Sequence, residues 1–327
     1  MRINPAAHCA LLMGLATLSA APAAGELYPS RPITLVVPFP AGGPTDTIAR
    51  VLAEPMRGSL GQPIVIENIT GAGGTIGVGR VAKAGPDGYT LCLGIWPTHV
   101  LAGAIYTLSY DVQKDFEPIG LIANNPQVIV ANKSVLAREL SELVNWARTR
   151  LGKATVGTAG TSSSQHVSGV LFEKLTGASL QFVPYRGAAP AIQDLIAGHI
   201  DLMFDQASSA LPYVRTGVLK AYAVASTVRL QSAPAIPTAE EAGLANFNIS
   251  VWAGLWAPRS TSRDIVAKLN GALVDAIRDP KVRARLEELG QELPPRKEQT
   301  PQALRQLQQA EIAKWWPIVK AAGIRAD

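Results

Sequence analysis

Short apolar runs alternate with amphipathic segments along most of the chain. Residues 33–37 read Ile-Thr-Leu-Val-Val, which is typical of a buried strand. In the next segment, residues 45–60, the side chains of Ile48, Leu52 and Met56 recur at the spacing of one helical face. The succession continues, and strands are predicted at residues 33–37, 64–67, 89–95, 117–123, 127–131, 154–158, 180–184, 200–204, 219–225 and 250–257.

Helical patterns fill most of the intervals between the predicted strands and dominate the C-terminal part of the chain. Strands that alternate with helices favour an α/β fold, in which a mostly parallel sheet is flanked by helices on both faces. Helices are predicted at residues 45–60, 140–151, 163–175, 189–197 and 264–278. A further helix follows the glycine-rich turn at residues 71–79 and ends near Ala84, and two more open at Pro280 and at Thr300-Pro301.

The pattern restarts within the chain and predicts two lobes, each built on its own sheet. The chain is expected to cross to the second lobe near Ala123 and to return near Ala223. The lobes then comprise residues 25–122 with about 226–327, and residues 123–225; the C-terminal helices are free to pack across both. Open α/β sheets bind ligands where the carboxyl ends of their strands meet, so the candidate site lies between the lobes.

The N-terminal segment has the features of a secretory signal peptide. Arg2 supplies a positive charge, and residues 10–21 are uncharged and mostly apolar but too few to span a bilayer. Ala21-Pro22-Ala23 fits the small residues of a cleavage site. We therefore predict a signal peptide at residues 1–24 and a mature protein in the periplasm, with a membrane anchor as the alternative.

The composition agrees with an exported, folded protein. The chain has 327 residues, of which 47% are apolar and 17% charged, and this argues for two domains and against extensive disorder. The net charge of +5 includes no basic run longer than two residues, so no nucleic-acid partner is expected. Cleavage would leave Cys92 as the one cysteine, which predicts a buried thiol without a disulfide. We expect a monomer that needs no cofactor.

Three loops that follow predicted strands of the first lobe contain candidate ligand-binding residues. Glycine lets the main chain approach an anion closely, and free N–H groups around Gly42 and Gly43, beside a helix N-terminus, would form an anion cradle. Thr45 or Asp46 is expected to cap the helix that follows, and His99 to offer an imidazole or to cap a helix. The candidates are Phe39, Ala41, Gly42, Gly43, Thr45 and Asp46 in the first loop, Gly73 and Gly74 in the second, and Trp96, Thr98 and His99 in the third.

The second of these loops contains the spacing Gly-x-Gly-x-x-x-Gly at residues 71–77. This spacing departs from the dinucleotide fingerprint, and the loop does not open the mature chain. A nest for a small anion or a water molecule is therefore favoured over a nucleotide site.

The second lobe contains a matching set of polar candidates. Hydroxyl groups at a helix N-terminus can bind a carboxylate without a neutralising cation. Arg186 is suited to pair with a carboxylate through two hydrogen bonds, or it points into solvent. Asp205 is suited to orient a donor, to bind a ligand hydroxyl or amine, or to cap a helix. The candidates are Gly160, Thr161, Ser162, Ser163, His166, Tyr185, Arg186 and Asp205.

Catalytic and metal chemistry find little support in the sequence. No Gly-x-Ser-x-Gly nucleophile motif occurs, and His166 follows Ser163 by three residues without a separate orienting acid. The histidines of the mature chain lack the short spacing of a metal-ligand pair. We therefore expect no catalytic residue and no metal site; an exported enzyme that acts on a small carboxylate or ester is the alternative.

Several motifs resemble one family of exported receptors. They are Val-Pro-Phe at residues 37–39 with Gly-Gly-Pro-Thr-Asp at 42–46, Gly-Ala-Gly-Gly at 71–74, Pro-Asp-Gly-Tyr-Thr-Leu at 86–91 and Val-Pro-Tyr-Arg-Gly at 183–187. In this order they resemble the substrate-binding proteins of tripartite tricarboxylate transporters, the Bug-type receptors. The resemblance implies a type II-like, two-lobed periplasmic binding protein that closes on a small carboxylate and delivers it to membrane transporter subunits.

The resemblance also implies how the ligand is held. In this family, main-chain amides, hydroxyls and waters of the first two glycine loops hold one carboxylate, and the side chains that select the ligand project from the second lobe. Three features of this chain depart from the family pattern: Arg186 stands where lysine is common, residues 161–165 are unusually rich in hydroxyls, and Trp96 is expected to favour an aromatic or flat ligand. The identity of the ligand therefore does not follow from the resemblance.

Overall fold

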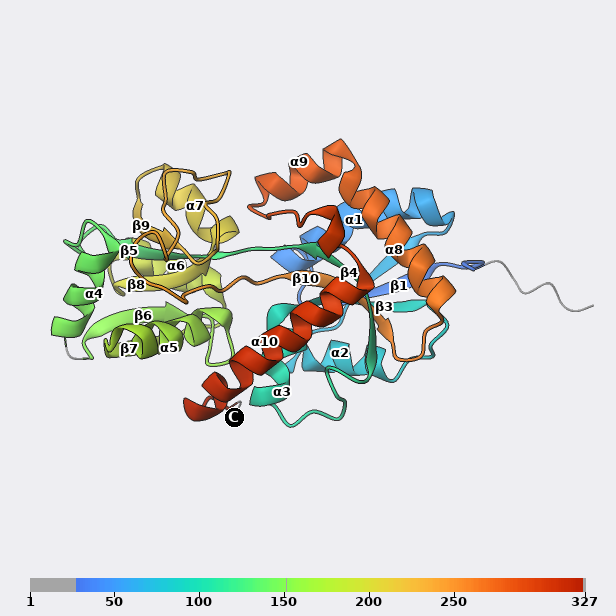
Figure 1. Ribbon diagram of the computed structural model, residues 1–327, viewed down its shortest axis with the longest axis horizontal. Coiled ribbons are helices and arrows are strands. Elements are labelled where there is room, and N and C mark those ends of the chain that lie inside the picture. The colour runs from blue at the N-terminus through green and yellow to red at the C-terminus, as the bar shows by residue number, and fades with distance from the viewer. Residues whose placement is uncertain (1–27, 151, 326–327) are drawn as a thin grey trace, which may run out of the picture.

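The computed structural model describes residues 28–150 and 152–325, so the predicted signal peptide lies outside the described residues. Two five-stranded sheets occupy opposite ends of the long axis (Figure 1). The first has the order β2-β1-β3-β10-β4 and contains β1 (Ile33–Val37), β2 (Ile64–Asn68), β3 (Thr90–Ile95), β4 (Phe116–Ala123) and β10 (Ala253–Pro258). The second has the order β7-β6-β8-β5-β9 and contains β5 (Gln127–Asn132), β6 (Ala154–Thr158), β7 (Leu180–Pro184), β8 (Leu202–Gln206) and β9 (Leu219–Val224).

In each sheet four strands run in one direction and one strand runs against them. β10 is antiparallel to both of its neighbours, β3 and β4, and β5 is antiparallel to β8 and β9. Each reversed strand is the one that the chain enters when it crosses from the other sheet. Such a strand starts at the boundary between the lobes and runs away from it, whereas the other strands end there. The sheets are therefore mixed, and the predicted parallel arrangement describes the direction of the other four strands.

Helices cover both faces of each sheet. Along β1, Ile33, Leu35 and Val37 pack with α1 and α8, whereas Val36 joins the core on the opposite face. Around the first sheet, α1 (Pro44–Leu60), α8 (Arg263–Arg278) and α9 (Pro280–Glu288) lie on one face and α2 (Thr75–Ala82), α3 (Ala102–Ile105) and α10 (Pro301–Ala321) on the other. Around the second sheet, α4 (Leu140–Thr149) and α5 (Ser164–Thr176) lie on one face and α6 (Ala188–Ala197) and α7 (Ala207–Arg215) on the other.

The segment between β9 and β10 packs against the second sheet. The ring of Phe247 lies 5.7 Å from that of Phe204 and 6.2 Å from that of Phe172. Ile249 N donates to Ala225 O at 3.0 Å, which holds the segment beside the end of β9. This packing favours a second lobe that extends to about residue 250 rather than ending at residue 225.

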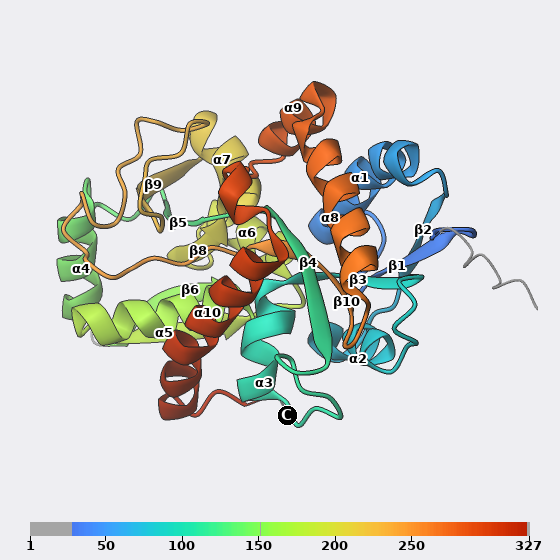
Figure 2. The ribbon, with the colours of Figure 1, turned by 45° about the vertical axis from the view of Figure 1, so that its right-hand side comes forward.

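The long helix α10 crosses the first lobe diagonally and reaches the connecting segment (Figure 2). It packs along the edge strand β4, and Lys314 Nζ donates to Asn248 O at 2.9 Å. Its Trp315 is fully buried, and the ring of this residue lies 5.1 Å from that of Trp96. The helix therefore covers the exposed edge of the first sheet and contacts the chain that joins the two lobes.

All ten predicted strands are present, and the structure adds helical elements that the pattern did not predict. Residues Pro97–Leu101 form a π-helix that continues into α3, and α7 follows β8. Cys92 is buried in β3 as predicted, and burial raises the pKa of its thiol. Within residues 28–150 and 152–325, every helix is too short or too polar to cross a bilayer.

Candidate functional site

Three loops of the first lobe meet at the carboxyl ends of β1, β2 and β3. A β-carbon added to Gly74 would lie 2.9 Å from Thr98 Cγ2 in the third loop and 3.2 Å from Pro38 Cβ in the first. Gly74 also has a φ of +92°, a left-handed conformation that glycine adopts without strain. The close approach of the three loops therefore depends on a glycine at this position.

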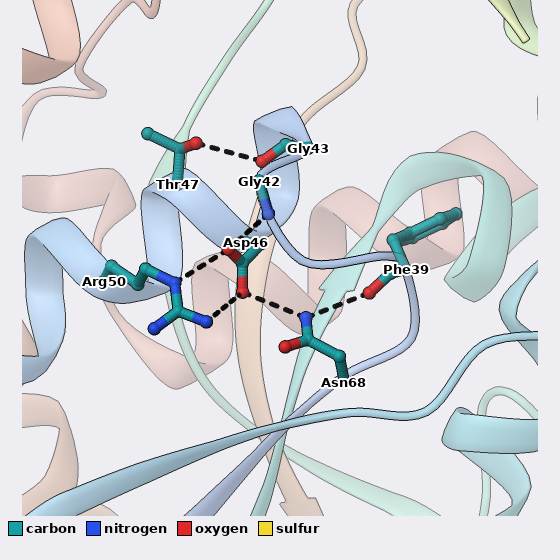
Figure 3. A network of polar contacts seen from close by, with 7 residues as sticks. All are labelled: Phe39, Gly42, Gly43, Asp46, Thr47, Arg50 and Asn68. Atoms are coloured by element: carbon teal, nitrogen blue, oxygen red, sulfur yellow. Dashed lines mark hydrogen bonds and ion pairs between the residues drawn. The ribbon is translucent and has the colours of Figure 1, made fainter.

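Asp46 fixes the first loop in place (Figure 3). Its buried carboxylate accepts hydrogen bonds from Gly42 N at 2.8 Å and from Asn68 Nδ2 at 2.9 Å. Arg50, one turn further along α1, donates to both carboxylate oxygens, at 2.8 and 3.0 Å. Asn68, at the end of β2, also donates to Phe39 O at 3.0 Å. One side chain thus ties together the loop, the helix and the neighbouring strand.

The same donors keep the Asp46 carboxyl charged. The hydrogen bonds from Arg50 are the largest cause, and together with those from Gly42 and Asn68 they lower the pKa of Asp46 from 3.8 to about 2 against the opposing effect of burial. Because the protein itself satisfies this carboxylate, the geometry favours Asp46 as a residue that positions the loop.

The first loop offers different N–H groups from those expected. Gly42 N donates to Asp46, and Gly43 N donates to Pro40 O at 3.3 Å, so neither N–H group is free. Gly43 is the N-cap of α1 with no side-chain cap, so the predicted capping by Thr45 or Asp46 is wrong. The first turn of the helix leaves the N–H groups of Thr45 and Asp46 without intrahelical partners. These two groups are the better candidates for an anion.

Tyr106 lies over the second glycine loop and contacts the other lobe. A β-carbon on Gly73, whose φ is +63°, would lie 2.6 Å from the hydroxyl oxygen of Tyr106. The same hydroxyl lies 3.1 Å from Ser162 Oγ, in the loop after β6. The pattern of strand ends did not reveal Tyr106, because it follows the unpredicted helix α3. Through Tyr106, the second glycine loop of the first lobe is thus linked to the hydroxyl-rich loop of the second lobe.

In the loop before α5, some of the hydroxyl groups form hydrogen bonds within the loop and with the start of the helix. Ser163 is the N-cap of α5: its Oγ accepts from His166 N at 3.3 Å and donates to Gly160 O at 2.7 Å. Thr161 is exposed and Ser162 is half-buried. The ring of His166 packs 4.4 Å from that of Phe182, and burial lowers the pKa of the imidazole. Thr161 and Ser162 therefore remain the hydroxyls best placed for a ligand.

The other second-lobe candidates differ in their burial and in whether their polar atoms already have partners. Tyr185 donates to Asp194 Oδ2 at 2.7 Å, and burial, followed by this bond, raises the pKa of the phenol to about 12. Arg186 is exposed and forms no ion pair within the described part of the chain. Asp205 is fully buried: its Oδ1 accepts from Gln165 Nε2 at 3.1 Å, its Oδ2 has no hydrogen-bond partner in the described part of the chain, and burial raises its pKa.

The third loop of the first lobe turns into the core. Trp96 is fully buried and donates from Nε1 to Glu311 Oε2 at 2.7 Å. His99 is also fully buried, its ring stacks 4.6 Å from that of Trp256, and burial lowers its pKa to about 3. Thr98 Oγ1 bonds both to Ile95 N and to Ile95 O. The π-helix turns the chain inward directly after β3, so the expected ligand contacts of Trp96 and His99 are corrected to core packing.

Replacing Tyr106 by phenylalanine should weaken ligand binding by about two- to twelvefold. The substitution removes one hydrogen bond between the lobes, which contributes roughly 0.5–1.5 kcal/mol. Titration calorimetry measures the change. Tyr110→Phe is the matched control, because the buried hydroxyl of Tyr110 has no hydrogen-bond partner within the described residues. Equal affinities for the Tyr106→Phe variant and the unmodified protein would show that the contact between Tyr106 and Ser162 does not contribute to ligand binding.

The described residues include no group of three or more His, Cys, Asp or Glu side chains that could hold a metal ion. The polar groups that the site does offer are amide, hydroxyl and guanidinium donors. Such donors suit an anion with several oxygen atoms.

Residues 48–324 match the model of a family described as the tripartite tricarboxylate transporter family receptor. Among solved structures, the chain is 42% identical to MatC from Rhodopseudomonas palustris with bound malate, covering 89% of this chain and 100% of that one, with a TM-score of 0.79. It is 38% identical to the periplasmic binding protein BugD, covering 91% and 100%, with a TM-score of 0.79. It is 34% identical to Rpa4515 from R. palustris with adipate, covering 91% and 100%, with a TM-score of 0.81.

Proposed function

This chain belongs to the tripartite tricarboxylate transporter receptor family, and on that premise we propose that it captures a small organic carboxylate between its lobes in the periplasm and delivers it to a membrane transporter. The observation that carries the proposal is the contact between Tyr106 and Ser162 at 3.1 Å. It joins Tyr106, which lies over the second glycine loop of the first lobe, to the loop after β6 in the second lobe, and a ligand between these elements gains contacts from both lobes as they approach. Those contacts are what shifts a receptor toward its closed state.

A dicarboxylate is the ligand class that the arrangement favours. The first lobe offers uncharged donors, among them the N–H groups of Thr45 and Asp46, which have no partner within the helix, and these suit one carboxylate group. The second lobe offers Thr161, Ser162 and Arg186, which forms no ion pair with the described residues, for a second group. The malate and adipate bound by the two R. palustris relatives are both dicarboxylates, in agreement with this division.

The experiment is a thermal-shift screen of the mature protein with mono- and dicarboxylates, followed by calorimetry on those that stabilise it. Binding at 100 times the dissociation constant raises the free energy of unfolding by about 2.7 kcal/mol. Mass spectrometry of the incubated carboxylate then separates a receptor, which returns it unchanged, from an enzyme. An absence of stabilisation by every carboxylate, or conversion of one of them, would refute the proposal.

Arg186→Ala should weaken the binding of a dicarboxylate far more than that of a monocarboxylate. If Arg186 closes onto the second carboxylate, its loss costs roughly 2–5 kcal/mol, in part because a charge is left unpaired. This corresponds to about thirtyfold or more in affinity. Calorimetry with adipate and with hexanoate gives the comparison, and Lys174→Ala, at the far end of α5, is the control. Equal, small losses for both ligands would assign Arg186 to solvent.

A further inference from the structure

A surface pocket of about 470 Å³ lies on the first lobe between α1 and α9. Arg50 of α1 and Arg285 of α9 line it, and their side chains are 56% and 55% exposed. Asp46 also lines the pocket, but only 1% of its side chain is exposed. Solvent in this pocket therefore meets two guanidinium groups and almost none of the carboxylate.

The carboxylates of Asp46 and Glu288 do not neutralise the positive charge of this pocket. Both oxygens of Asp46 are occupied by the N–H groups of Gly42, Asn68 and Arg50. Arg285 donates to Glu288 Oε2 at 2.9 Å, but Glu288 is 66% exposed, and such exposed pairs exchange readily for another partner. A carboxylate that enters from outside therefore competes with the exposed Glu288 for Arg285 and with the buried Asp46 for Arg50.

Arg50 connects this pocket to the ligand loop (Figure 3). Its Nε and Nη2 atoms hold the carboxylate of Asp46, and Asp46 in turn holds Gly42 N and Asn68. An external carboxylate that pairs with Arg50 competes with Asp46 for the same guanidinium. Its arrival therefore loosens the hold of Asp46 on the loop that follows β1.

We propose that this pocket is the docking site for an acidic side chain of the membrane transporter, and that docking there promotes release of the ligand. The proposal rests on the proposed function, which requires a membrane partner. An acidic side chain fits better than an anionic lipid surface, because the cations line a concave pocket and are two in number rather than spread over a broad face. The ion pair with Arg285 holds the partner in the pocket. The ion pair with Arg50 weakens the attachment of Asp46 to the loop that follows β1.

The test separates docking from ligand binding with the variants Arg285→Glu and Arg283→Glu. The two residues lie two positions apart on α9, both are about half exposed and both pair with a glutamate, but only Arg285 lines the pocket. Calorimetry with adipate should give affinities within twofold of the unmodified protein for both variants. In cells that lack their own copy of the receptor, Arg285→Glu should lower adipate uptake at least tenfold, whereas Arg283→Glu should support normal uptake.

A second measurement tests release. Detergent-solubilised membranes from the same cells should accelerate dissociation of adipate from the unmodified protein severalfold and leave its dissociation from Arg285→Glu unchanged. Normal uptake with Arg285→Glu would overturn the proposal, as would a large loss of adipate affinity, which would make the pocket part of the ligand site. Equal loss of uptake in both variants, or equal loss of binding to phosphatidylglycerol vesicles, would indicate general attraction to an anionic surface instead. Failure of the unmodified protein to bind any carboxylate would instead refute the proposed function.

Discussion

Asp46→Ala should lower the free energy of unfolding by roughly 1–3 kcal/mol and weaken carboxylate binding by at least about tenfold. The substitution leaves Gly42 N and Asn68 Nδ2 without their acceptor and releases Arg50. The first loop then loses its attachment to both α1 and β2, and the amides at the helix N-terminus lose their fixed position. Denaturant unfolding and calorimetry measure the two effects.

Two further variants serve as controls for Asp46→Ala. Glu54→Ala removes an exposed carboxylate on the same helix, which pairs with Arg57, and should change neither quantity. Asp46→Asn keeps one acceptor oxygen and should be intermediate. Unchanged affinity and stability in Asp46→Ala would show that the loop holds itself without this side chain.

The pH dependence of stability follows from the same carboxylate. The pKa of Asp46 is lowered from 3.8 to about 2 in the folded protein, so its contribution is fully present above about pH 4. The contribution declines as the pH falls from about 4 toward 2, because the unfolded chain takes up the proton first. The decline should be smaller in Asp46→Asn, which has no proton to take up.

Gly73→Ala should weaken ligand binding by more than about tenfold. The residue has a φ of +63°, where an L side chain costs roughly 1–2 kcal/mol, and the added β-carbon would lie 2.6 Å from the hydroxyl oxygen of Tyr106. The variant must displace either the loop or Tyr106, and either movement disturbs the contact with Ser162. Calorimetry measures the loss, and the melting temperature shows that the fold survives.

A double variant identifies the cause of that loss. Gly73→Ala with Tyr106→Phe removes the hydroxyl and leaves the ring carbon Cζ at 3.2 Å, which a small shift accommodates. The double variant should therefore bind more tightly than the sum of the two single losses predicts. Gly58→Ala, at an exposed position of α1 with no atom within 4 Å of the added carbon, should bind normally. Strictly additive losses would mean that Tyr106 and Gly73 act independently.

The strand order and the site loops differ in how far the sequence predicts them. Apolar runs such as residues 33–37 define strands locally, because both faces of such a strand are covered and its side chains are mostly apolar. The alternation also predicted where each strand ends, and so the loops around Gly42, Gly73 and Ser162. It did not predict the reversed direction of β5 and β10, which depends on where the chain crosses between the lobes.

The side chains within the loops were harder to predict. A tryptophan and a histidine at a strand end suggested ligand contacts. The chain instead forms a π-helix at Pro97–Leu101, and both Trp96, its N-cap, and His99, within it, are buried in the core. Asp46 lay in the correct loop, yet its role depends on Arg50 and on Asn68, which is distant in sequence. Tyr106 had no local signal, because its importance arises from a contact with Ser162 across the lobes. Contacts between residues that lie far apart in the sequence do not change the periodicity of apolar positions along the chain.

The most direct test of the central claim is the titration of isotope-labelled mature protein with adipate, followed through the backbone amide signals in two-dimensional NMR. We expect the largest shifts at loops of both lobes: Thr45 and Asp46 at the start of α1, Gly73 in the second loop, and Thr161 and Ser162 before α5. Shifts that saturate with adipate but stay within one lobe, or that avoid these loops, would contradict capture of the carboxylate between the lobes.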